Sequence, residues 1–248
     1  MSLFCCEDIC KSYGDQIVVR DISLHLQSGE TLGLLGVSGV GKTTLMAVLA
    51  GVERPDRGRV LLQGEDITGI PGRVGYMLQK DLLLPFKTAL DNIYLPLILK
   101  GMKKAEARQR ALEQMELFGL AGSEDKYPYQ LSGGMRQRAA LARTHFLGTK
   151  VILLDEPFAA LDAITKGEMH DWYLDVAAKT GLSTIFITHD VDEALTLSDR
   201  LYIIAGTPGS ITSQIDLPYP HPRSAEFALT EKYLQLKREV LGHIGIKN

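Results

Sequence analysis

Apolar residues along the chain form short runs separated by polar turns, and most of these runs have the spacing of strands. Residues 3–10 and 16–27 read as two strands around the turn K-S-Y-G-D-Q, and the second alternates as V-V-R-D-I-S-L-H-L. The apolar run at 151–154 is typical of a strand buried inside a parallel sheet. Further strands are predicted at 32–35, 60–63, 74–78, 183–188, 201–205 and 210–215.

Helical spacing dominates the middle of the chain. Residues 88 to about 118 follow a helical pattern, and K-K-A-E-A-R-Q-R-A-L-E-Q-M-E reads as a solvated amphipathic helix. A block of about 60 residues that ends at Gly148 interrupts the alternation of strands and helices, which predicts a helical insertion. We therefore predict a single α/β domain over 1–248, with a core at 1–85 and 149–220, a helical subdomain at 86–148 and a C-terminal amphipathic helix at 224–244.

Residues 36–43 read G-V-S-G-V-G-K-T, which is the pattern G-x-x-x-x-G-K-[ST]. An apolar strand precedes this motif and helical spacing follows it, as a phosphate-binding loop requires. The glycines let backbone N–H groups approach phosphate oxygens, and the start of the helix adds its dipole. Lys42 can reach the terminal phosphates, and the Thr43 hydroxyl can ligate Mg²⁺. The pattern predicts that the chain binds a nucleoside triphosphate.

Polar residues follow three of the predicted strands. Asp155 ends an apolar strand, where phosphate-loop proteins carry a Mg²⁺ ligand, and Glu156 can act as a general base on water. His189 follows a parallel strand, which brings it beside the same phosphates, although a lone histidine is most often structural. Gln79 ends another strand and is placed to touch Mg²⁺ or the attacking water, or else it is a solvated loop amide.

A second helix start has the features of an anion site. Residues 131–138, L-S-G-G-M-R-Q-R, open a helix in which Ser132 can be the N-cap and the two glycines leave the first N–H groups bare. One nucleotide does not need two such sites from one subunit, but two subunits arranged head-to-tail would use both.

Two other features have two interpretations each. The apolar segment 81–95, D-L-L-L-P-F-K-T-A-L-D-N-I-Y-L, is either core or the face that meets a partner. Tyr13, on the first turn, either stacks on a purine ring or is an ordinary hairpin residue.

The composition is that of a soluble globular protein, with 45% hydrophobic and 23% charged residues and a net charge of −3. This balance argues against a whole-domain nucleic-acid binder. The first residues lack a secretory signal, and no window approaches the ~20 apolar residues of a membrane-spanning helix. We therefore expect a soluble protein whose membrane role comes through partners. Cys5, Cys6 and Cys10 match no common zinc spacing and are expected to be free thiols in a first strand.

Together these motifs resemble the ATP-binding cassette (ABC) family, the ATPase subunits of ABC transporters, over about residues 3–220. The resemblance implies a phosphate-loop NTPase core with an antiparallel β subdomain and an inserted helical subdomain, and it implies ATP and Mg²⁺ as cofactors. It implies a Mg²⁺ site of Thr43, Gln79 and Asp155, and catalytic roles for Lys42, Gln79, Glu156 and His189. The implied nucleotide contacts are Tyr13 on adenine, the loop residues Gly36, Val37, Ser38, Gly39, Val40, Gly41, Lys42, Thr43 and Thr44, the signature residues Ser132, Gly133 and Gly134, and Asp162 of the D-loop.

One position departs from the family pattern. Met135 replaces the glutamine of the usual L-S-G-G-Q, but Ser132, Gly133 and Gly134 are intact, so we expect activity to survive. The run L-S-G-G-M-R-Q-R and the segment after Gln79 resemble the importer branch that serves nitrate, sulfonates, taurine and thiamine precursors.

This branch implies an importer ATPase at the cytoplasmic face of the cell membrane. Its partners would be a second copy of the chain, a separate permease and, indirectly, an extracytoplasmic solute-binding protein, with no nucleic acid. An ATPase of an exporter or lipid-extraction complex is the alternative. A cassette protein that acts on nucleic acid or ribosomes would carry two cassettes or a long coiled-coil insertion, and the sequence has neither.

Overall fold

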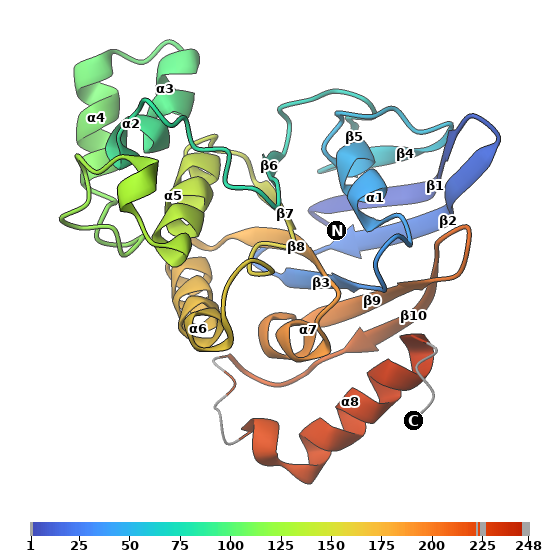
Figure 1. Ribbon diagram of the computed structural model, residues 1–248. Coiled ribbons are helices and arrows are strands. Elements are labelled where there is room, and N and C mark those ends of the chain that lie inside the picture. The colour runs from blue at the N-terminus through green and yellow to red at the C-terminus, as the bar shows by residue number, and fades with distance from the viewer. Residues whose placement is uncertain (1, 222, 224–226, 245–248) are drawn as a thin grey trace.

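Two β-sheets and the helices around them form the fold of the computed structural model, which describes residues 2–221, 223 and 227–244 (Figure 1). The larger sheet has the strand order β10-β9-β3-β8-β7-β6. Its neighbours pair in parallel except at the edge, where β10 is antiparallel to β9. Its strands are β3 (Thr31–Leu35), β6 (Gly75–Met77), β7 (Val151–Asp155), β8 (Ser183–Thr188), β9 (Arg200–Ala205) and β10 (Ser210–Asp216). The strands predicted for this sheet are confirmed to within one residue at each end.

The smaller sheet is antiparallel and has the order β2-β1-β4-β5. It consists of β1 (Phe4–Tyr13), β2 (Gln16–Leu26), β4 (Arg57–Leu62) and β5 (Glu65–Asp66). Tyr13 pairs with Gln16, so the first turn is shorter than predicted and contains only residues 14 and 15. The strand predicted at 60–63 begins earlier, because Arg57 and Arg59 pair with β1 even though their side chains are polar.

One buried cluster joins the two sheets through α1 (Lys42–Leu49). Leu45, Met46 and Leu49 of this helix are fully buried against residues of both sheets. This packing fixes the helix, and therefore the loop before it, at the end of β3.

A second buried cluster gathers the helical part of the chain at one end of the molecule (Figure 1). It contains residues of α2 (Ala89–Ile93), α3 (Leu95–Leu99), α4 (Lys104–Leu112) and α5 (Gly133–His145), together with α6 (Ala163–Thr180) and β7. The helical segment therefore shares a core with the larger sheet, and its division from the rest at 86 and 148 stays a prediction.

Two predicted helices are longer than the observed ones. The helix expected to run from residue 88 to about 118 is divided among α2, α3 and α4, and α4 ends at Leu112. Gly119, with φ of 63°, then reverses the chain so that Phe118 and Leu120 are both buried. The helix expected at 224–244 is observed as α8 (Glu231–Ile244), which begins later than predicted. The Thr230 hydroxyl accepts the N–H of Tyr233 and so caps the helix at this point. Residues 224–226 lie outside the described part.

Short elements complete the fold. They are α7 (Val191–Leu197) and the 3₁₀ turns η1 (Pro128–Gln130) and η2 (Phe227–Leu229). No helix in the described part of the chain is long and apolar enough to cross a membrane. Cys5, Cys6 and Cys10 are free thiols, as predicted, and burial raises the pKa of Cys6 to about 12.

Candidate nucleotide site

Three parallel strands deliver the predicted site residues to one edge of the larger sheet. β8 lies between β3 and β7, and Leu35 is in register with Thr188, just as Asp155 is with Ile187. Backbone hydrogen bonds continue past the strand ends, from the N–H of Gly36 to the Thr188 carbonyl at 3.3 Å and from that of Glu156 to the Ile187 carbonyl at 3.1 Å. The loop before α1, the end of β7 and the end of β8 are therefore held side by side.

At two positions of the loop at 36–41, Gly36 and Gly41, the backbone accommodates only glycine. Gly41 has φ of 102°, and a Cβ there would lie 2.6 Å from Val19 Cγ1. A Cβ on Gly36 would lie 2.6 Å from the Ile204 carbonyl oxygen. The turn is thus tight, and it leads directly into the start of α1, where unpaired N–H groups and the helix dipole suit an anion.

Lys42 lies beneath this loop and is 5% exposed. Its Nζ donates to the carbonyls of Gly36 at 2.7 Å and Val37 at 3.0 Å. Burial lowers the pKa of Lys42, and the negative charges of Glu156 and Asp155 oppose that effect. The side chain is therefore a positive charge held inside the loop.

Asp155 is 4% exposed and pairs with two hydroxyl groups. Tyr76 donates to its Oδ2 at 3.3 Å, and Thr43 is hydrogen-bonded to the same carboxyl. Burial raises the pKa of Asp155, while both hydrogen bonds lower it. A carboxylate and a hydroxyl are oxygen ligands that fit Mg²⁺, which keeps its other positions for water and phosphate. Within the described ranges no group of three or more His, Cys, Asp or Glu residues could hold a metal.

Glu156 and His189 meet at one carboxylate oxygen. The Oε1 atom of Glu156 is 3.2 Å from His189 Nδ1 and 4.0 Å from Lys42 Nζ. Glu156 has φ of 45°, a left-handed conformation that is uncommon for a residue with a Cβ. In this conformation its N–H is bonded to the Ile187 carbonyl and its carboxylate faces Lys42 and His189.

The signature residues lie elsewhere. Ser132 is exposed and caps α5 by accepting the N–H of Met135 at 3.2 Å, while a Cβ on Gly134 would contact Met169. Across residues 2–221, 223 and 227–244, no hydrogen bond or ion pair joins Ser132, Gly133 or Gly134 to the loop at 36–44. One copy of the chain therefore does not bring its two predicted anion sites together.

The remaining predicted residues lie on other elements, with Tyr13 at the end of β1, Asp162 before α6 and Gln79 after β6. Tyr13 is half exposed at the first turn, with Lys11 Nζ 5.2 Å from its ring centre. Asp162 caps α6 by accepting the N–H groups of Ile164 and Thr165, and the Thr165 hydrogen bonds hold the pKa of its carboxyl below the usual range. Gln79 is exposed and lines a cavity of about 570 Å³ beside Gly133.

Several residues near the site were not predicted. Besides Tyr76, Lys166 of α6 pairs with Asp190 at 3.0 Å, and Asp190 caps α7 directly after His189. The spacing of Asp190 and Glu193, an acid three residues after a possible cap, was a sequence signal for this helix start. No sequence signal identified Tyr76 or Lys166.

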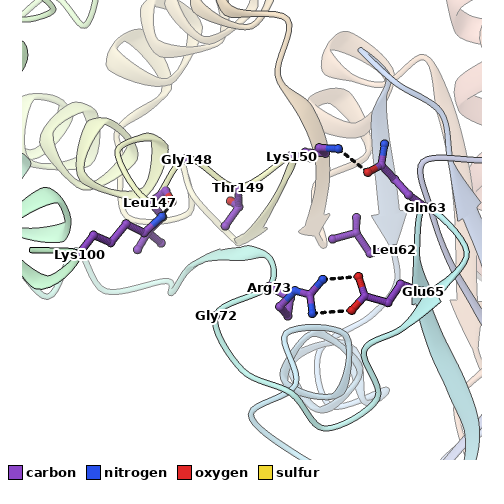
Figure 2. Close-up of a pocket in the computed structure, with 10 residues that line it drawn as sticks. All are labelled: Leu62, Gln63, Glu65, Gly72, Arg73, Lys100, Leu147, Gly148, Thr149 and Lys150. Carbon is purple, nitrogen blue, oxygen red and sulfur yellow. Dashed lines mark hydrogen bonds and ion pairs between the residues drawn. The ribbon is translucent and has the colours of Figure 1, made fainter.

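A hollow of about 430 Å³ lies away from this site, between the β4–β5 turn and the loop before β7 (Figure 2). Figure 2 shows Arg73 facing Glu65 through two hydrogen bonds, and Lys150 reaching Gln63. Lys100 donates to the Leu147 carbonyl. Each cation of this hollow already has a partner that ties two chain segments together, so we assign no ligand to it.

Comparisons with known proteins agree with this geometry. The family described as ABC transporter matches residues 19–159. The chain is 43% identical over 202 residues to the taurine import ATP-binding protein TauB of Pseudomonas aeruginosa, and the aligned region covers 82% of this chain and 77% of TauB. It is 38% identical over 236 residues to the nitrate import ATP-binding protein NrtC of Synechococcus elongatus, and the aligned region covers 93% of this chain and 36% of NrtC. The chain thus spans about a third of the length of NrtC.

The fold is also similar to a solved structure. That structure is a dimeric ATP-binding cassette in a post-hydrolysis state, bound to ADP and Pi; the identity is 28% and the TM-score 0.74, over 88% of this chain and 100% of that one. The family match, the relatives and the site agree: the chain belongs to the ABC transporter family, as one of its ATP-binding and ATP-hydrolysing subunits.

Proposed function

We propose that the chain is the ATPase subunit of an importer for a small anionic or organic solute of the nitrate, sulfonate, taurine or thiamine-precursor type. It would power a separate permease from the cytoplasmic face of the membrane, with a solute-binding protein on the other side. The observation that carries the ATPase assignment is the convergence of Lys42, at the start of α1, with Asp155 and Glu156 at the end of β7. The names of the taurine and nitrate relatives favour import over the alternative of an exporter or lipid-extraction complex.

In this proposal the loop amides and Lys42 hold the β- and γ-phosphates. Thr43, Asp155 and Gln79 would hold Mg²⁺, which when bound neutralises charge on the phosphate oxygens. Tyr13 would stack on the adenine ring.

Glu156 is assigned as the general base. Its Oε1 accepts a proton from the attacking water, and His189 keeps that oxygen in place while its ring contacts the γ-phosphate. The negative charge that develops on the phosphoryl group is spread over Lys42 and the loop amides, which are already oriented and need no rearrangement.

A second copy completes the site in this proposal. Ser132, Gly133 and Gly134 stand at the free start of α5, away from the loop of their own chain. In a head-to-tail dimer they would contact the γ-phosphate bound by the other copy, and Asp162 would lie near the shared interface. ATP then favours the closed dimer because only that state contacts it from both sides.

The test is the size of the Glu156→Gln variant, measured by light scattering after gel filtration with and without Mg-ATP. We expect a monomer without nucleotide and a dimer with it, because ATP is bound and not consumed. Lys42→Ala combined with Glu156→Gln is the control and should stay monomeric, since the charge that faces the phosphates is lost. A dimer that forms equally without ATP would contradict the shared site, and wild-type turnover in Glu156→Gln would contradict the general base.

A further inference from the structure

The segment 81–88 presents two exposed apolar side chains and is held to α5 by two arginines. Leu82 is 53% exposed and Phe86 is 72% exposed. Arg143 donates to the carbonyl of Asp81 at 2.6 Å and to that of Leu82 at 2.7 Å. Arg136 donates from Nε to the Asp81 carboxylate at 3.2 Å. One turn of backbone is therefore clamped by two side chains of a single helix.

The clamp depends on the shape of the segment. Leu82 has φ of 46°, and a residue with a Cβ keeps this conformation only where its surroundings hold it. The Arg143 guanidinium is half-buried, which lowers its pKa, and two of its N–H groups bond to carbonyls of the segment. Asn92, fully buried, holds the other side by accepting the N–H of Leu84 at 2.7 Å.

The same helix begins at the signature residues. Arg136 lies one turn after Ser132, and besides Asp81 it donates to the Leu131 carbonyl at 2.8 Å. A single side chain thus touches both the backbone just before the signature and the start of the segment 81–88. Arg143 repeats the connection two turns further along α5.

We propose that Arg136 and Arg143 are positioning residues that make α5 and the segment 81–88 move as one body. ATP that engages the start of α5 then displaces Leu82 and Phe86, the apolar surface available to the permease. The inference rests on the proposed function, in which Ser132, Gly133 and Gly134 meet the ATP of a second copy.

The test compares variants made in the Glu156→Gln background, with Mg-ATP as the probe. Arg143→Met removes both carbonyl bonds, and Arg143→Lys keeps a cation there. Arg110→Met is the matched control, since this exposed α4 arginine pairs only with Glu106 in the described part of the chain.

Hydrogen exchange is followed at three amides of the segment, and dimerisation is measured in parallel. The amides are those of Leu83, bonded to Asp81 Oδ1 at 3.0 Å, Leu84, bonded to Asn92 Oδ1 at 2.7 Å, and Lys87, bonded to the Leu84 carbonyl at 3.1 Å.

We expect Mg-ATP to slow exchange at these amides in the parent and in Arg110→Met. Arg143→Met should still dimerise, but its three amides should exchange about tenfold faster, and ATP should no longer change their rate. Arg143→Lys should recover part of the response. A purely structural role for Arg143 would raise the exchange rate and leave the response to ATP intact.

An ATP response in Arg143→Met equal to that of the parent would overturn the proposal, as would a parent that dimerises with no change at these amides. A parent that does not dimerise with Mg-ATP would instead overturn the proposed function on which the inference rests. If Arg143→Met does not fold, Asp81→Ala removes the carboxylate partner of Arg136, and the same loss of the ATP response is expected at Leu84 and Lys87.

Discussion

Tyr76 affects a motif residue although it belongs to no motif. It lies in β6, paired with Leu153 of β7, and its hydroxyl donates to Asp155 two positions further along that strand. Burial raises the pKa of Asp155, and the hydrogen bond from Tyr76 is the largest effect that lowers it. Tyr76 therefore favours the ionised form of the carboxyl, which is the form that the proposed Mg²⁺ site requires.

We predict that Tyr76→Phe weakens the use of Mg²⁺. Loss of one hydrogen bond to a carboxylate, about 1.5 kcal/mol, corresponds to roughly a tenfold higher Mg²⁺ concentration for half-maximal ATPase activity. The pKa of Asp155 should rise further, so protons compete with Mg²⁺ and the defect should be larger at pH 6.5 than at pH 7.5. ATPase rates measured against Mg²⁺ at both pH values test this.

The matched control for that experiment is Tyr202→Phe. Tyr202 is buried, whereas Tyr76 is half-buried, and the Tyr202 hydroxyl is hydrogen-bonded to His25, away from the site. Equal Mg²⁺ requirements in the two variants would contradict the role of Tyr76.

At this scale the sequence predicted some neighbours and missed others. Asp155, Glu156 and His189 follow strands that the pattern identified as buried, and parallel strands end at the same edge, so their proximity could be expected. Tyr76 and Lys166 could not be found this way, because their contacts depend on which strand and which helix pack beside the site. The roles of all these residues remain proposals.

Among the elements, α7 carries a buried carboxyl group, that of Glu193, next to the site. Glu193 is 2% exposed, and its Oε1 has no hydrogen-bond partner among the described residues. Burial raises the pKa of Glu193 to about 8, while Lys166 and a hydrogen bond with Thr188 lower it. Near neutral pH its side chain is therefore mostly protonated in the folded protein.

We predict that Glu193→Gln stabilises the protein increasingly as the pH rises. In the unfolded chain the carboxyl ionises near pH 4.3, but in the folded chain near 8, so folding takes up a proton between these values. Protonated Glu193 contributes its full stability to the fold below the unfolded pKa. As the pH rises from that value through the folded pKa, the free energy of unfolding falls by up to about 1.4 kcal/mol for each pH unit. Glutamine has the same shape and no charge to lose.

Urea unfolding of both proteins at pH 5.5 and pH 7.5 checks this prediction. The gain in stability from Glu193→Gln should be larger at pH 7.5. Glu239→Gln, on an exposed position of α8, is the control and should show no such dependence. An equal gain at both pH values would contradict a protonated Glu193.

The elements show why strands were predicted better than helix ends. Buried strands such as β7 and β8 are apolar throughout and are bounded by polar residues, so their limits are visible in the sequence. In the helical segments the polar and apolar alternation continues past the true ends. The reversal at Gly119 and the cap by Thr230 depend on local hydrogen bonds and packing that periodicity does not report.

In the whole molecule, the two predicted anion sites are separated. Lys42 lies at the start of α1, after the loop that follows β3, whereas Ser132 lies at the start of α5, and no hydrogen bond or ion pair in the described ranges connects them. If each ATP is bound by the loop of one copy and the signature residues of the other, a defect in either region disables both ATP sites of a dimer made of two identical variant chains. In a dimer of one Lys42 variant and one Ser132 variant, the two defects fall in the same ATP site, and the other ATP site is intact.

We predict that Lys42→Ala and Ser132→Glu, each inactive alone, recover activity when the two proteins are mixed. Lys42→Ala removes the charge that faces the phosphates, and Ser132→Glu places a carboxylate against them. In the mixed dimer one composite site carries both defects and the other carries none. Random pairing makes half of the dimers mixed, each with one good site of two, so about a quarter of the parental ATPase rate should return. If both sites acted within one copy, mixing would restore nothing, and a rate equal to the average of the two separate variants would contradict the head-to-tail arrangement.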